Sequence, residues 1–90
     1  MEKVYVVIAL AKDNPNENWR FLENDIPGSL SVYQTFLDAK EGVSTFANSL
    51  KFWGWREHVF TQVENVREWR EFIAGKKHIS LLIIEKELFM

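Results

Sequence analysis

The chain has 90 residues, a length that predicts one globular domain spanning residues 1–90 with a single hydrophobic core. It is 47% hydrophobic and 27% charged, which argues against intrinsic disorder. The absence of cysteine excludes disulfides, thiolate metal sites and a cysteine nucleophile, and the net charge of -2 argues against a protein that neutralises nucleic-acid phosphates.

The sequence also predicts a cytoplasmic protein. Its first residues lack the basic start and the small-residue cleavage site of a signal peptide. No apolar run approaches the roughly 20 residues that a membrane-spanning helix needs.

Two apolar runs predict the centre of a β-sheet. Residues 79–84 are almost entirely apolar and rich in branched side chains, and residues 4–10 have the same character. Runs of this length and composition are typical of strands covered on both faces. We expect a first strand over residues 3–11 and a last strand over about 79–87, lying side by side.

The segment after the first strand has two readings. Asn14 followed by Pro15 and Glu17 favours a short capped helix. The alternative is a long loop with a brief extended piece at residues 19–21. A Pro-Gly pair within residues 24–29 then predicts a tight turn.

Residues 30–37 predict a second strand of mixed polarity, followed by a helix. Asp38 and Glu41 have the spacing of a helix capping box, and Gly54 follows where a left-handed residue ends a helix. The predicted inward-facing stripe recurs at helical spacing and consists of Val43, Phe46, Ala47, Leu50 and Trp53.

The last third of the chain predicts a third strand over residues 55–64 and a second helix. Asn65 and Glu68 repeat the capping-box spacing, and Gly75 ends the predicted helix. Its expected buried stripe consists of Val66, Trp69, Phe72 and Ile73.

These elements predict an α+β fold of the α/β-like sandwich type. The expected order is β-(short α or loop)-β-α-β-α-β, with a four-stranded mixed sheet and the main helices on one face. The apolar first and last strands should lie centrally, with the second and third strands outside them.

The sequence gives little sign of catalysis or metal binding. His58 and His78 lack the spacing of a helical metal pair, and the acidic residues around 13–25 lack the alternating pattern of a calcium loop. No serine or threonine lies in a nucleophile motif, and the glycines form no phosphate-binding loop. We therefore expect no enzymatic activity, no cofactor and no metal.

The stretch from residue 52 to 56 is the best candidate for a binding surface. Aromatic residues and arginine dominate the energetics of many protein interfaces. We assign Phe52, Trp55 and Arg56 to a partner-binding site, joined by Trp19 and Phe21 if the fold brings them together. Trp53 is expected in the core, and the competing reading is that the rings plug the end of the sheet.

The functional hypothesis is a small non-enzymatic protein-interaction module, such as an adaptor, regulator or inhibitor. The alternatives are a small-molecule-binding sensor domain and a weak single-stranded nucleic-acid binder that uses the same aromatic residues. A homodimer formed through an edge strand is compatible with each of these.

Overall fold

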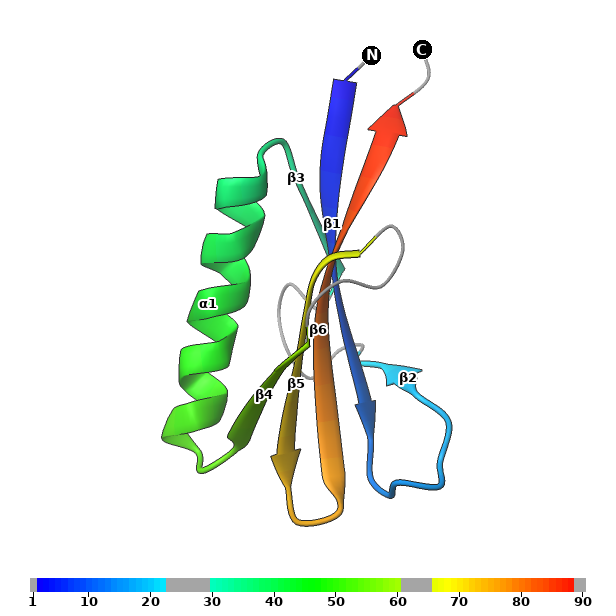
Figure 1. The fold of residues 1–90 in the computed structure, drawn as a ribbon, viewed down its shortest axis with the longest axis vertical. Helices are drawn as coiled ribbons and strands as arrows, with labels where there is room; N and C mark the ends of the chain where they lie inside the picture. Colours follow the sequence, from blue (N-terminus) through cyan, green and yellow to red (C-terminus); the bar gives the residue numbers. More distant parts are fainter. Residues whose placement is uncertain (1, 23–29, 61–65, 89–90) are drawn as a thin grey trace.

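The protein folds into one antiparallel sheet with a helix on one side of it (Figure 1). A computed structural model describes residues 2–22, 30–60 and 66–88. The elements in chain order are β1 (Glu2–Lys12), β2 (Arg20–Phe21), β3 (Leu30–Tyr33), α1 (Phe36–Phe52), β4 (Arg56–Phe60), β5 (Val66–Ala74) and β6 (Lys77–Leu88). The strand order is β2-β1-β6-β5-β4, and β3 also pairs with β1.

The predicted pair of apolar strands is confirmed at the middle of the sheet. β1 and β6 run antiparallel in continuous register from Glu2 opposite Leu88 to Lys12 opposite His78. The second and third predicted strands are also confirmed in position, because β3 lies outside β1 and β4 forms the opposite edge.

The core lies between α1 and one face of the sheet. Side chains alternate between the faces of a strand, so every second residue of β1 and β6 points toward α1. The buried apolar residues are Val7, Ala9 and Ala11 of β1, Ile79, Leu81 and Ile83 of β6, Phe72 of β5, and Ala39, Val43, Ala47 and Leu50 of α1. The alanines allow the helix to approach the sheet closely.

The other face of the central strands is only half buried. Val6 lies opposite Ile84 and Ile8 opposite Leu82, and all four side chains keep part of their surface exposed. The expectation that the central strands are covered on both faces is therefore wrong: α1 covers one face, and the described residues form no second helix to cover the other.

Tyr33 and Gly42 pack together where α1 passes β3. A Cβ atom built on Gly42 would lie 2.5 Å from the Tyr33 hydroxyl oxygen. Glycine therefore leaves room for the tyrosine ring, which packs against the core. This close approach explains a residue that is otherwise unfavourable within a helix by up to about 1 kcal/mol.

The predicted fold class is wrong. The described residues form six antiparallel strands and one helix, not a four-stranded mixed sheet with two main helices. The largest error concerns the segment predicted as a second helix, which is strand β5. Gly75, with φ of 63°, and Lys76 form the two-residue turn that joins β5 to β6 in a hairpin.

Charged residues on both faces of β5 made this strand resemble an amphipathic helix in the sequence. Its four charged residues looked like the solvent-facing side of a helix, yet three of them pair with residues on other strands, and the fourth, Glu68, has a buried carboxylate oxygen without a hydrogen-bond partner among the described residues. The pairs are Arg67 with Glu85, Arg70 with Glu57, and Glu71 with His78. Cross-strand contacts of this kind stabilise a sheet and permit charged residues on both of its faces.

The remaining boundaries also differ from the predictions. The favoured short helix after β1 is wrong, since residues 13–17 form turns and β2 matches the extended alternative. The second strand ends at Tyr33 instead of Leu37, and α1 begins three residues earlier than expected, with Thr35 and not Asp38 as its N-cap. The predicted turn at 24–29, the end of the third strand at 61–64 and the capping residue Asn65 lie outside the described residues.

Within the described part of the chain, α1 has 17 residues and is neither long nor apolar enough to cross a membrane.

Candidate functional site

The end of α1 is a Schellman motif, in which the chain reverses through a left-handed residue. The Gly54 N–H donates to the Lys51 carbonyl over 3.0 Å, and the Trp55 N–H donates to the Leu50 carbonyl over 3.0 Å. Gly54 has φ of 91°, a value that glycine adopts without the penalty other residues incur. The predicted left-handed residue at this position is confirmed.

This turn sends neighbouring aromatic side chains in opposite directions. In a Schellman motif, the residue after the glycine packs back onto the last turn of the helix. Trp55 accordingly packs against the core and is half buried. Phe52 and Trp53 are 84% and 77% exposed, and their rings meet edge to face with centroids 5.8 Å apart.

The expectation that Trp53 belongs to the core is therefore wrong. The buried stripe of α1 consists of Ala39, Val43, Ala47 and Leu50, and Trp53 lies one residue past the end of the helix. The helical period no longer determines its direction there. The Gly-Trp pair at 54–55 is the feature of the sequence that could have predicted this, because a residue after a helix-ending glycine tends to face inward.

An ion-pair network fixes the helix end against the sheet. Glu57 on β4 accepts from Lys51 of α1 at 2.6 Å and also bonds Arg70 of β5. The side chains of Glu57 and Arg70 are each only 14% exposed. Partial burial raises the pKa of Glu57, but hydrogen bonds and charge from Lys51 and Arg70 outweigh it and lower this pKa below its ordinary value.

Phe21 does not join the helix end. It lies in β2, and β2 and β4 are opposite edges of the sheet, separated by four strand spacings, or about 19 Å. Trp19 lies under the Lys12 ammonium, 4.4 Å from the ring centroid, and edge to face with His78. Phe21 is 54% exposed beside β1. Phe21 is therefore far from the helix end, whereas Trp19 lies beside His78 of the central strand β6.

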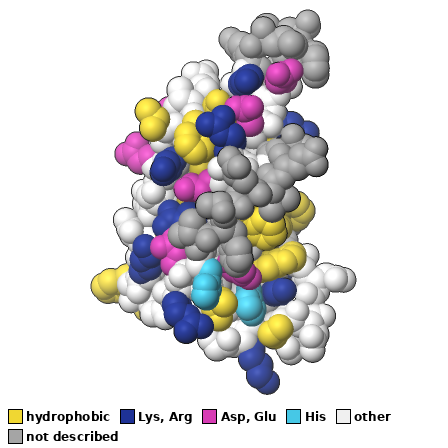
Figure 2. All heavy atoms as spheres, in the orientation of Figure 1, with side chains coloured by type: hydrophobic (Ala, Val, Ile, Leu, Met, Phe, Trp, Pro, Cys, Tyr) yellow, Lys and Arg dark blue, Asp and Glu magenta, His cyan; other side chains and the backbone are white. Residues whose placement is uncertain are grey.

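The histidines lie on the sheet face away from α1, and both are visible in Figure 2. His78 Nδ1 lies 3.1 Å from a Glu71 oxygen, and His58 lies opposite Glu71 in the β4–β5 register. Among residues 2–22, 30–60 and 66–88, no group of three His, Cys, Asp or Glu side chains could hold a metal ion. The Ser80 hydroxyl is buried and accepts from Trp69 Nε1, so it is not placed to act as a nucleophile.

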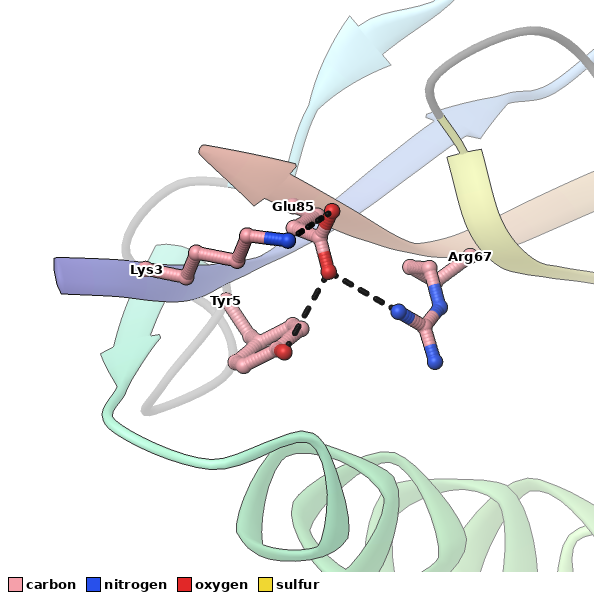
Figure 3. Close-up of polar contacts among 4 residues, drawn as sticks. All are labelled: Lys3, Tyr5, Arg67 and Glu85. Carbon is pink, nitrogen blue, oxygen red and sulfur yellow. Dashed lines mark hydrogen bonds and ion pairs between the residues drawn. The ribbon is translucent and has the colours of Figure 1, made fainter. Parts of the chain in front are cut away.

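A second polar cluster surrounds Glu85 (Figure 3). Its carboxylate accepts from Arg67 at 2.8 Å and from the Tyr5 hydroxyl at 3.3 Å, and Lys3 lies 3.7 Å away. Desolvation raises the pKa of Glu85, whereas Lys3, Tyr5 and Arg67 together lower it below its ordinary value. The cluster joins β1, β5 and β6, which indicates a structural role.

The chain was compared with known proteins in three ways. No family model, no curated protein and no solved structure matches it.

Proposed function

We propose that this protein is a small interaction module that docks on another protein through the end of its helix. The docking residues are Phe52, Trp53 and Arg56, which we call the aromatic helix end. This assignment replaces Trp55 with Trp53, because Trp55 packs against the core and Trp53 is 77% exposed. The observation that carries the proposal is the exposure of two neighbouring rings on a fixed turn.

The position of these rings favours binding for two reasons. A turn held by three backbone N–H groups restricts the rings before any partner arrives, so less conformational entropy is lost on association. Covering both rings would remove about 300 Å² of apolar surface from water, worth up to about 7 kcal/mol before the cost of association.

We further propose a cytoplasmic location. A chain without cysteine gains no disulfide stabilisation from an oxidising compartment.

The test is quantitative affinity capture from a lysate of the source cells, comparing the wild-type bait with Phe52→Ala/Trp53→Ala. We expect the double variant to lose at least about 90% of one stoichiometric protein, because aromatic anchors commonly contribute more than 2 kcal/mol each. Its melting temperature should stay close to that of wild type, since both rings are exposed.

Leu37→Ala is the matched control. Leu37 is 76% exposed at the opposite end of α1, so this variant removes exposed apolar surface outside the proposed site. It should capture the same protein as wild type. Equal capture by the double variant would contradict the proposal, and capture lost on nuclease treatment would favour single-stranded nucleic acid as the ligand of these rings.

A further inference from the structure

The aromatic helix end lies beside exposed basic side chains contributed by two other elements. In Figure 1 the end of α1, the start of β4 and the β5–β6 turn lie at the same end of the molecule. Arg56 begins β4, Lys76 lies in the turn and Lys77 begins β6, and all three are exposed. We call Arg56, Lys76 and Lys77 the basic rim.

The carboxylates near this rim are already engaged by other side chains. Glu57 is paired with Lys51 and Arg70, and Glu71 is paired with His78. None of the three rim residues forms an ion pair with any residue that the structure describes. The charge of the basic rim is therefore not neutralised by its described neighbours, on a chain whose net charge is -2.

The rim residues border the end of the sheet on both of its faces. Arg56 lies opposite Ile73 on β5, and Lys77 lies opposite Ala74 on the other side of the same strand. Ile73 and Ala74 point to opposite faces of the sheet, so Arg56 lies on the face away from α1 and Lys77 on the α1 side, and two strand spacings, or about 10 Å, separate β4 from β6. A partner that covers the rings also comes within reach of these charges.

We propose that the partner of the aromatic helix end is an acidic protein surface: an apolar pocket that receives Phe52 and Trp53, bordered by Asp and Glu side chains that face the basic rim. This inference rests on the proposed function and adds the chemistry of the partner. Charge complementarity of this kind mainly accelerates association, whereas the buried rings determine how slowly the complex dissociates.

The test uses the protein recovered by the wild-type bait and measures its association and dissociation rates by surface-based kinetics. Lys76→Glu/Lys77→Glu reverses two exposed rim charges and leaves Arg56, which the docking proposal already uses, unchanged. We expect its association rate constant at low salt to fall at least about tenfold, with a small change in dissociation. The wild-type association rate should decrease between about 0.05 and 0.5 M NaCl, and that of the variant should not.

Lys40→Glu/Lys86→Glu is the control, because it changes the net charge equally at exposed positions on α1 and β6 outside the rim. It should keep the wild-type rate. Equal rates for the two charge-reversed variants would overturn the acidic partner while leaving the docking proposal intact. The acidic partner would also be overturned, in favour of a lipid surface, if the wild-type protein sedimented with phosphatidylserine vesicles and the Phe52→Ala/Trp53→Ala variant did not. If the wild-type protein captures no partner that the Phe52→Ala/Trp53→Ala variant loses, both proposals are contradicted.

Discussion

Glu57 is the residue that ties the candidate site to the sheet. Its carboxylate joins Lys51 on α1 to Arg70 on β5, and only 14% of its side chain is exposed. Because these cations lower its pKa below 4.5, the ionised carboxylate is stabilised in the folded protein relative to the unfolded chain. Its contribution to stability is present above pH 4.5 and is lost as the pH falls through the lowered pKa.

We therefore predict that Glu57→Gln lowers the free energy of unfolding at pH 7 by about 1.5–3 kcal/mol, the range typical of hydrogen bonds to charged groups. Below pH 4.5 the difference between variant and wild type should shrink, because the wild-type carboxylate becomes protonated. Urea denaturation from pH 7 down to about pH 3 measures both effects.

Glu41→Gln is the control for this experiment. Glu41 is exposed on α1 and forms no ion pair with a residue of the described segments. This variant should follow the wild-type pH dependence throughout. A Glu57→Gln variant whose destabilisation stays constant down to pH 3 would show that the charge on Glu57 contributes nothing.

At the scale of the element, the end of α1 determines which rings are exposed. The helix is held at its start by Thr35, whose hydroxyl accepts from the Asp38 N–H at 3.1 Å, and at its end by the Schellman bonds. Gly54 has open space where a Cβ would be, so only its backbone conformation requires glycine.

Replacing Gly54 with alanine should accordingly destabilise the protein by about 1–2 kcal/mol, the cost of a left-handed conformation for a residue with a Cβ. Gly54→Asn should cost less, because asparagine enters this region more readily. Thermal unfolding of the three proteins measures the order. Equal stability of wild type and Gly54→Ala would show that the turn relaxes without strain. The alanine variant should also capture less partner, since the turn positions Phe52 and Trp53.

At the scale of the whole molecule, the pairing of the chain's two ends dominates the architecture. β1 and β6 come from opposite ends of the sequence and pair along their full lengths, whereas β2 contributes only two residues at one edge. Long-range pairing of this kind makes the central ladder dependent on the complete fold.

Amide hydrogen exchange should therefore be slowest at Val7, Leu81 and Ile83, which are buried in the central pair. These amides should exchange only through global unfolding, at least about 100-fold more slowly than those of Arg20 and Phe21 at the edge. NMR exchange at neutral pH measures this ratio. Faster exchange in the central pair than in β2 would contradict a stable unit built on β1 and β6.

The sequence predicted the features that depend on local pattern. The β1 and β6 strands, the helix over the middle of the chain and the left-handed residue at Gly54 all follow from hydrophobic runs, helical spacing and glycine position. It also singled out residues 52–56, although it expected Trp53 in the core, whereas Trp53 is exposed and Trp55 packs against the core.

Only the tertiary structure decided the remaining features. Val66–Ala74 is a strand because Arg67, Arg70 and Glu71 find partners on neighbouring strands, and no local pattern records such distant contacts. Likewise, the sequence left open whether the fold brings Trp19 and Phe21 to Phe52, and the strand order puts Phe21 at the sheet edge opposite β4, while Trp19 lies beside His78 of β6. Local periodicity determines which way a side chain points within an element, whereas the pairing of distant segments determines what it meets there.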